Sequence, residues 1–257
     1  MGAGDTGGDG RVVELLVLGD SLTFHGPERP MPADDPRLWP NVAAAQLGGR
    51  AELFAAAGWT ARDAWWALTG NPRVWAVLPR VSALVLAVGS MDALPSPLPT
   101  ALREDIRYLR PARLRRWVRR AYRAAQPHLA RLLRGRPVAL PPRLTVHYLD
   151  RCLRAVRTLR PGLPVVGVVP AVHRAPSYAR VHTGHAPAVA AVRRWAATAG
   201  IELLDLPALV GAHVAAGRGN PDGLHWGWEA HERVGRELAR ILGRSGVKTT
   251  PGAATSP

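Results

Sequence analysis

The sequence predicts an α/β fold in which a parallel β-sheet is covered by helices on both faces. Short apolar runs end at glycine or proline, and the clearest of them covers residues 81–88. This run is continuously apolar, as in a strand that is buried on both faces. Segments with helical periodicity separate the apolar runs, which favours parallel strands joined by helical crossovers. The 257 residues, of which 47% are hydrophobic, suffice for one such domain.

The predicted strands and helices alternate along the chain. Strands are expected at residues 12–19, 51–57, 81–88, 165–169 and 201–206. Helices are expected at residues 38–47, 59–68, 102–136, 144–159, 188–199 and 227–242. Thr60 is expected to cap the second of these helices. Residues 11–243 are therefore predicted to form a single domain, with flexible tails at 1–10 and 244–257.

An arginine-rich segment follows the third strand. Residues 102–136 contain twelve arginines with tyrosines and a tryptophan among them, and they lie in a basic helical insert at 93–142. The formal charge of the chain is +15, and its only lysine is Lys248. Such a balance suits a nucleic acid, an anionic membrane surface or a phosphorylated ligand, although a solvated basic surface explains it equally well. Because no nucleic-acid-binding motif accompanies the arginines, a nucleic-acid partner is disfavoured.

The ends of the chain and its cysteine content bear on where the protein works. Residues 1–10 are glycine-rich and polar and do not resemble a signal peptide. The apolar run at 12–18 is far too short to cross a bilayer. Cys152 is the one cysteine, which excludes an internal disulfide framework and suits a small core residue. We expect a cytoplasmic protein without a transmembrane segment. The sequence is compatible with both a monomer and a homo-oligomer.

Four loops carry residues that together suit nucleophilic catalysis. Ser21 lies where the first strand ends, at the edge of the sheet where open α/β folds bind ligands. A serine needs a base, and His225 would take its proton while Asp222 orients the imidazole. The backbone N–H groups of Ser21 and Gly58 would face the oxyanion of an acyl-transfer reaction.

The order of these blocks resembles the GDSL (SGNH) hydrolase superfamily. The blocks are Gly19-Asp20-Ser21-Leu22, then Gly58, then a Gly-x-x-Asp block at 89–92, then Asp222-x-x-His225. The resemblance covers about residues 12–243 apart from the arginine-rich insert. It implies a flavodoxin-like, three-layer α/β/α sandwich with five parallel strands. It also implies hydrolysis or transfer of esters and thioesters, with no metal or other cofactor.

Met91 departs from the family pattern. The family usually has asparagine at this position, and the asparagine side chain donates a hydrogen bond to the oxyanion. Methionine cannot donate, and losing one such donor typically costs roughly 3–4 kcal/mol of barrier. Ser90, Asn41 or a loop histidine could substitute, the enzyme could be slow, or the acyl donor could already be activated. A thioester such as acyl-CoA fits the last case, and the basic insert could then form a lid or a CoA-docking face.

Within the superfamily, two stretches resemble the actinobacterial diglucosylglycerate octanoyltransferases. They are LGDSLTF at 18–24 and GSMD at 89–92 with the following LPSPLP at 94–99. The resemblance implies transfer of an octanoyl group from octanoyl-CoA to a glucosylglycerate acceptor in the synthesis of a polymethylated polysaccharide. The alternatives are a GDSL esterase or thioesterase that uses water, and an inactive basic scaffold that binds nucleic acid.

Further residues near the four blocks are candidates for substrate contacts. They are Asp20, Phe24, His25, Trp59, Met91, Asp92, His173 and Trp226. Asp20 and Asp92 are better suited to holding loops through backbone N–H groups than to chemistry. Trp59 and Trp226 suit the core, an acyl pocket or a sugar platform. His182 and His185 lack a third metal ligand, so no metal site is expected.

Overall fold

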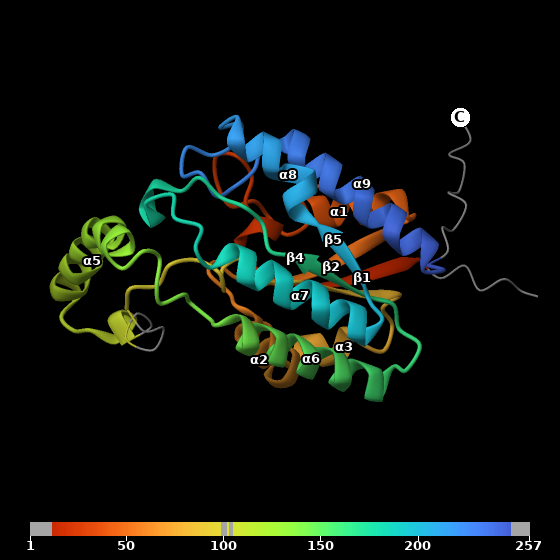
Figure 1. The fold of residues 1–257 in the computed structure, drawn as a ribbon. Coiled ribbons are helices and arrows are strands. Elements are labelled where there is room, and N and C mark those ends of the chain that lie inside the picture. Colours follow the sequence, from red (N-terminus) through yellow and green to blue (C-terminus); the bar gives the residue numbers. More distant parts are fainter. Residues whose placement is uncertain (1–11, 99–101, 103–104, 248–257) are drawn as a thin grey trace, which may run out of the picture.

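Five parallel strands form one sheet in the part of the chain that the computed structural model describes, which is residues 12–98, 102 and 105–247. The strand order is β2-β1-β3-β4-β5, the flavodoxin-like order that the family resemblance implied (Figure 1). The strands are β1 (Val13–Gly19), β2 (Gly49–Ala55), β3 (Ala83–Ala87), β4 (Val165–Val169) and β5 (Glu202–Asp205). Each agrees with a predicted strand to within about two residues at either end.

Helices cover both faces of the sheet, so the predicted three-layer α/β/α sandwich is confirmed (Figure 1). One face carries α1 (Trp39–Gln46), α8 (Leu206–Ala215) and α9 (Trp228–Arg244). The other face carries α2 (Ala61–Gly70), α3 (Pro72–Val77), α6 (Pro142–Leu159) and α7 (His185–Ala199). Side chains alternate along β1: Val13, Leu15 and Val17 enter the first core, whereas Leu16 and Leu18 enter the second.

Two short helices were missed by the sequence prediction. The Asn71 side chain accepts a hydrogen bond from the backbone N–H of Arg73 and begins α3. Asp205 ends β5 and at the same time caps α8 through the N–H of Ala208. Because α8 follows its strand without a break and is apolar on most sides, its start is hard to distinguish from the end of the strand.

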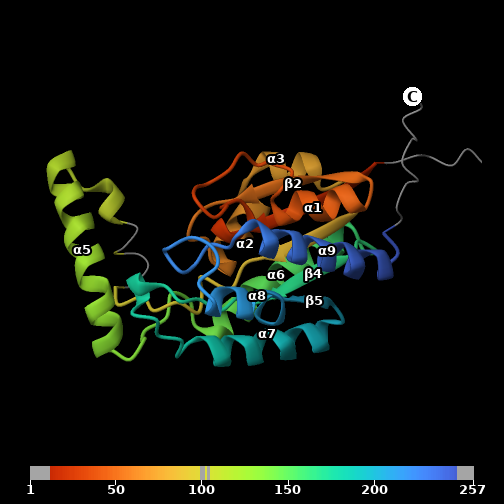
Figure 2. The same cartoon turned by 90° about the horizontal axis from the view of Figure 1, so that it is seen from above.

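The arginine-rich insert stands beside the sandwich. Its main helix is α5 (Ala112–Leu132), with only Ala130 buried, and the two views show it apart from the other helices (Figures 1 and 2). A short 3₁₀ turn, η2 (Ile106–Tyr108), precedes it. The insert is tied to the exit of β3 by a short stem, in which the N–H of Ser96 donates to Pro137 O at 2.8 Å and that of Ala139 to Leu94 O at 3.0 Å. The stem fixes the base of the insert close to the end of β3.

The C-terminal boundary differs slightly from the prediction. Helix α9 runs to Arg244, and Val247 is buried against the first core. Residues 244–247 therefore belong to the domain and not to a tail. The predicted tails at 1–10 and from residue 248 onward lie outside the described residues.

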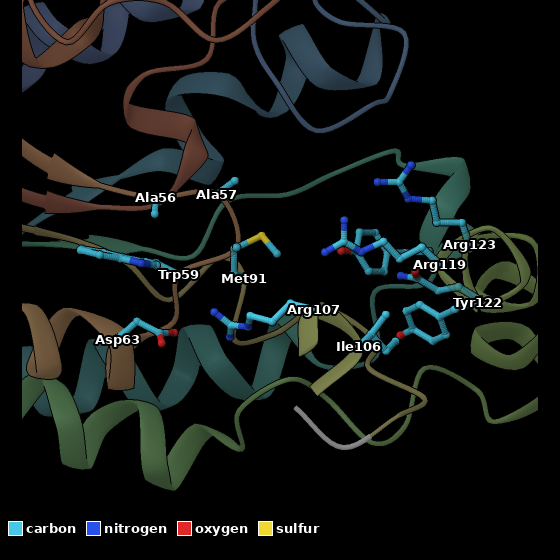
Figure 3. A pocket seen from close by; sticks show the side chains of 13 residues that line it. Ala56, Ala57, Trp59, Asp63, Met91, Ile106, Arg107, Arg119, Tyr122 and Arg123 are labelled. Atoms are coloured by element: carbon cyan, nitrogen blue, oxygen red, sulfur yellow. The ribbon is translucent and has the colours of Figure 1, made fainter. Parts of the chain in front are cut away.

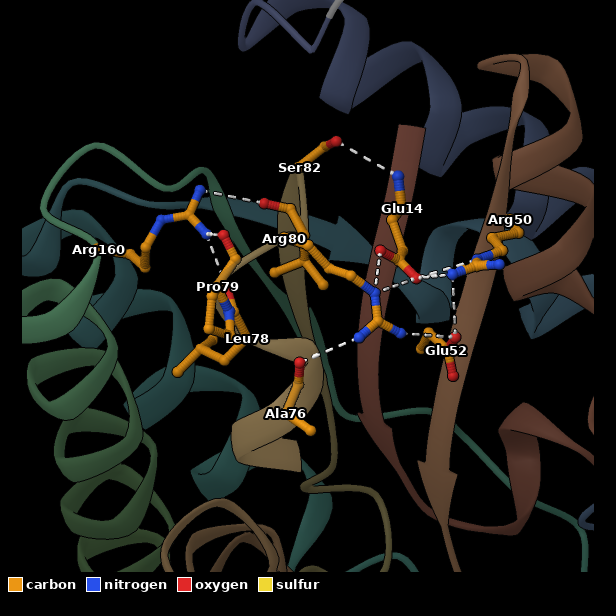
Figure 4. A network of polar contacts seen from close by, with 10 residues as sticks. Glu14, Arg50, Glu52, Ala76, Leu78, Pro79, Arg80, Ser82 and Arg160 are labelled. Atoms are coloured by element: carbon orange, nitrogen blue, oxygen red, sulfur yellow. Dashed lines mark hydrogen bonds and ion pairs between the residues drawn. The ribbon is translucent and has the colours of Figure 1, made fainter. Parts of the chain in front are cut away.

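The opposite end of the sheet from Ser21 is held by an ionic network centred on Glu14 (Figure 4). This buried carboxylate on β1 accepts hydrogen bonds from Arg50 on β2, at 2.6 Å and 2.9 Å, and from Arg80, which precedes β3. Burial alone would raise the pKa of Glu14, but the two guanidinium groups outweigh it and hold the pKa below its usual value. The network joins the starts of three adjacent strands.

Candidate active site

Ser21 lies at the carboxyl end of the sheet, immediately after β1. The strand ends at Gly19, where an added Cβ would lie 2.2 Å from a side-chain carbon of Thr23, so the position requires glycine. Asp20 caps the 3₁₀ turn η1 (Ser21–Thr23) by accepting a hydrogen bond from Leu22 N at 2.9 Å. This tight turn presents the Ser21 hydroxyl toward the loop that precedes α9.

Ser21, His225 and Asp222 form one hydrogen-bonded chain, as the sequence predicted. Ser21 Oγ lies 2.9 Å from His225 Nε2, and His225 Nδ1 lies 2.6 Å from Asp222 Oδ2. The other carboxylate oxygen of Asp222 accepts from the backbone N–H groups of Leu224 and His225. Burial by itself would raise the pKa of Asp222, but the hydrogen bonds from His225 and the backbone outweigh it and lower the pKa, so the carboxylate is charged at neutral pH.

His25 packs against the imidazole of His225 and is not placed to contact a substrate in either cavity beside Ser21. The two rings are stacked, with centroids 3.7 Å apart and planes 16° apart. His25 Nδ1 lies 2.7 Å from Gly26 O, and His25 O lies 3.2 Å from Nε2 of His231. His231 Nδ1 accepts from the N–H of Trp39, so its Nε2 carries the proton that is donated to His25 O. Sequence reasoning gave no indication of this stacked pair.

Gly58 has the backbone conformation that a turn glycine provides. Its φ is +81°, and no atom lies within 4 Å of an added Cβ. The turn is fixed on its far side by Thr60 and Asp63, which form the capping box of α2, so Thr60 caps this helix as predicted. Asp92 also holds it, because its carboxylate accepts from Ala61 N and from the hydroxyl of Thr145 at 2.8 Å.

Two cavities meet at Met91. A crevice of about 20 Å³ adjoins Ser21 and is mostly apolar; its lining residues are Ser21, Leu22, Ser90, Met91, Leu94, Ala171, Val172, His173 and Leu224. A cavity of about 720 Å³ lies on the other side of Met91, between Gly58 and the basic insert (Figure 3). The first is closed to anything much larger than a water molecule, so an acyl chain would have to open it. The second is large enough for a hydrophilic substrate.

The predicted substrate contacts divide between these cavities and the core. Trp59 and Met91 line the large cavity, and His173 lines the crevice. Asp20, Asp92 and Trp226 are at most 1% exposed and line neither cavity, so the structure does not bring them together with the other predicted contacts. The first two hold loops, which is the other role that the sequence suggested, and Trp226 packs in the core. Phe24 is half-buried and also lies outside both cavities.

The proposed substitutes for the missing oxyanion donor are partly engaged elsewhere. Both donor positions of the Asn41 amide are used by Ala33 O and Asp35 O, at 2.8 Å each, so this candidate was wrong. Ser90 Oγ accepts from Ala171 N at 2.9 Å and lines the crevice beside Ser21. His173 also lines it; its Nδ1 accepts from Ala175 N, and burial lowers its pKa to about 4, so the ring is neutral.

The insert supplies cavity residues that sequence reasoning did not identify. They are Ile106, Arg107, Arg119, Tyr122, Arg123 and Gln126, joined by Tyr178 of the 3₁₀ turn η3 (Pro176–Tyr178). The only sequence signal was the interleaving of arginine and aromatic residues at 102–136. It gave no means of choosing which arginines face the sheet.

Two general properties complete the description of the site. Among the described residues, no three His, Cys, Asp or Glu side chains are grouped so that they could hold a metal ion. His182 stacks on His173, and His185 Nε2 contacts Pro170 O. No helix in residues 12–98 or 105–247 is both long enough and apolar enough to span a membrane.

The chain is similar to several known proteins. The diglucosylglycerate octanoyltransferase of Mycolicibacterium hassiacum is 51% identical over 238 residues, which cover 93% of this chain and 98% of that protein. The enzyme of the same name from Mycobacterium tuberculosis is 49% identical, with 93% and 95% covered. The solved structure of the native M. smegmatis aryl esterase has the same fold, with a TM-score of 0.60 at 16% identity over 90% of this chain and 99% of that one. The profile of the GDSL-like lipase/acylhydrolase family matches residues 17–233, and the chain belongs to that family.

Proposed function

We propose that this enzyme transfers an octanoyl group from octanoyl-CoA to a sugar hydroxyl of a glucosylglycerate-type acceptor, through an acyl-enzyme on Ser21. The observation that carries the proposal is the Ser21–His225–Asp222 chain, with Met91 beside it, in a sequence about half identical to two diglucosylglycerate octanoyltransferases. A cytoplasmic step in polysaccharide synthesis fits this reaction. The proposed chemistry uses no metal or other cofactor.

The first half of the reaction forms the acyl-enzyme. His225 Nδ1–H donates to Asp222, which leaves Nε2 free to accept the Ser21 proton as Oγ attacks the thioester carbonyl. In this proposal the N–H groups of Ser21 and Gly58 donate hydrogen bonds to the developing oxyanion. The carbon–sulfur bond then breaks, and CoA leaves as the thiol after His225 returns the proton.

The second half repeats the chemistry with a sugar hydroxyl. His225 removes the hydroxyl proton, the sugar oxygen attacks the octanoyl-enzyme carbonyl, and the Ser21–acyl bond breaks with the proton returning to Ser21 Oγ. The products are the octanoylated acceptor and free enzyme.

Met91 supports a thioester as the acyl donor. A methionine side chain cannot donate to the oxyanion, and one missing donor typically costs roughly 3–4 kcal/mol of barrier. A thioester carbonyl is more electrophilic than that of an ester, and a thiolate is a better leaving group. An activated donor therefore offsets part of the missing stabilisation.

The test is release of CoA from octanoyl-CoA with and without a glucosylglycerate acceptor. We expect release beyond one equivalent of CoA per enzyme to require the acceptor, to be unaffected by EDTA, and to disappear in Ser21→Ala. Mass spectrometry of the enzyme mixed with octanoyl-CoA alone should show one octanoyl group on Ser21. Equal release without acceptor would establish a thioesterase instead. Salt-sensitive binding to arbitrary DNA with no labelling of Ser21 by a fluorophosphonate would establish a basic scaffold.

A further inference from the structure

The cavity between Gly58 and the basic insert has walls of two different kinds. One wall is the turn after β2, with Trp59, together with Met91. The facing wall belongs to the insert, and Figure 3 shows Arg119 and Arg123 on that side of the space, while the Arg107 side chain extends toward Asp63. The cavity therefore extends from Gly58, the predicted oxyanion donor, to the arginine side chains of the insert.

Arg119 and Arg123 are available to a ligand. They are four residues apart on α5, so they lie on one face of the helix. In the described part of the chain, neither makes a hydrogen bond or an ion pair with another side chain. Asp63, the one carboxylate among the described residues of the cavity wall, accepts hydrogen bonds from Thr60 N at 2.7 Å and Thr60 Oγ1 at 2.6 Å.

Helix α9 provides a contrast within the same chain. Three of its arginines pair with glutamates one turn away: Arg233 with Glu229, Arg236 with Glu232 and Arg240 with Glu237. Helix α5 contains no Asp or Glu over its 21 residues. The charge on α9 is therefore neutralised within the helix, whereas the charge on α5 has no acidic partner in its own helix.

The remaining wall residues suit a hydrophilic organic anion better than a bare ion. Trp59, Tyr122 and Tyr178 provide aromatic surface, and about 720 Å³ is far more than one phosphate or carboxylate group fills. Guanidinium groups bind carboxylate and phosphate oxygens through two parallel hydrogen bonds. Under the proposed function both hydrophilic substrates are anionic: CoA carries phosphates, and a glucosylglycerate carries a carboxylate.

We propose that this cavity is an anion subsite, in which Arg119 and Arg123 bind the phosphate or carboxylate of the hydrophilic substrate while its reacting group lies at Ser21. This inference rests on the proposed function. The acyl chain would extend to the other side of Met91, into the apolar crevice.

The test compares Arg119→Gln and Arg123→Gln with Arg120→Gln. The control removes the same charge from the same helix, and Arg120 lies outside the cavity. We expect the two cavity variants to raise the KM for an anionic substrate by about tenfold or more, with a smaller effect on kcat, and Arg120→Gln to match the wild type. Cavity variants that match Arg120→Gln for both substrates would overturn the inference.

Neutral analogues identify the source of the anion. If the cavity variants raise the KM for the acceptor, and raise it less for a neutral glucosylglycerol, the subsite binds the carboxylate. If they raise the KM for octanoyl-CoA, and raise it less for octanoyl-pantetheine, the subsite binds phosphate. A KM increase that persists undiminished with both neutral analogues would contradict an anion subsite.

A binding measurement keeps the subsite separate from the reaction. CoA and glucosylglycerate are titrated calorimetrically into Ser21→Ala protein, alone and combined with Arg123→Gln or Arg120→Gln. If the Ser21→Ala/Arg123→Gln protein binds either ligand more weakly and the Ser21→Ala/Arg120→Gln protein does not, the result supports the subsite. This holds even if the wild type shows no octanoyl transfer. Equal binding in all three proteins would overturn it even if transfer is observed.

Discussion

The imidazole of His225 is held from three directions: by Asp222, by Ser21 and by the ring of His25. Burial, followed by the neighbouring His225, lowers the pKa of His25, so its ring is neutral at neutral pH. The stack therefore orients His225 without adding a charge beside it. We expect His25→Ala to slow Ser21 labelling by a fluorophosphonate about three- to tenfold, the scale of one lost aromatic contact.

His25→Phe is the matched control, because phenylalanine retains a flat ring at this position but no titratable nitrogen. We expect it to keep most of the labelling rate, with an unchanged pH profile. A rate for His25→Phe as low as that for His25→Ala would instead assign the effect to the nitrogen atoms of His25.

The second single-residue prediction concerns Met91. Asparagine at this position would restore the side-chain donor that the family usually has there. We expect Met91→Asn to raise the rate of p-nitrophenyl octanoate hydrolysis by about tenfold or more, part of the 10²–10³ that one oxyanion donor typically contributes. Met91→Leu, which also lacks a donor, should leave this rate low. No gain in Met91→Asn would show that another group, such as Ser90, already completes the oxyanion site.

At the scale of elements, the sequence predicted those strands and helices whose ends are set by nearby residues. Strand β4 was predicted to the residue because Pro164 and Pro170 bound a continuous apolar run. The missed helices α3 and α8 begin at caps that directly follow another element, so no loop separates them from it. The placement of α5 beside the sandwich was equally inaccessible, because it depends on a stem of backbone hydrogen bonds between residues far apart in sequence.

We expect the α/β sandwich to fold without helix α5. Ser96 N and Pro137 O are 2.8 Å apart, so residues 98–135 can be replaced by a Gly-Ser link with little change at the ends of the stem. We expect the shortened protein to fold, with the circular dichroism of an α/β protein and with Ser21 still labelled by a fluorophosphonate. Transfer of octanoyl to the acceptor should be lost. Retained transfer would show that the insert is dispensable for substrate binding.

Across the whole molecule, the sequence anticipated that Ser21, Asp222 and His225 come together, because the loop after the first strand and the loop that enters the last helix can reach the same edge of the sheet. It did not anticipate contacts that depend on how loops pack in three dimensions. His25 and His225 are about as far apart in sequence as the triad members, but no motif marks a stacked pair. Trp226 lies next to His225 in sequence, and its ring nevertheless turns into the core under α9.

One buried carboxyl joins three parts of the molecule and gives a pH-dependent prediction for the whole fold. Asp92 follows β3 and binds the start of α2 and the Thr145 hydroxyl of α6. Burial raises its pKa to about 7 from an ordinary 3.8. Between these values the folded state holds a proton that the unfolded state releases, so this group makes the protein less stable as the pH rises.

Replacing Asp92 with asparagine should remove that dependence, because the amide oxygen can still accept hydrogen bonds but does not titrate. We expect the free energy of unfolding of the wild type, relative to Asp92→Asn, to fall between about pH 4 and pH 7 by at most about 1.4 kcal/mol per pH unit. Above about pH 7 the difference should become constant. Urea titrations at each pH measure it, with Asp35→Asn as the control. Asp35 is paired with Arg37, and its pKa lies below its usual value, so it adds no slope in this window. Parallel pH curves for the wild type and Asp92→Asn would show that Asp92 is ionised in the folded protein throughout the range.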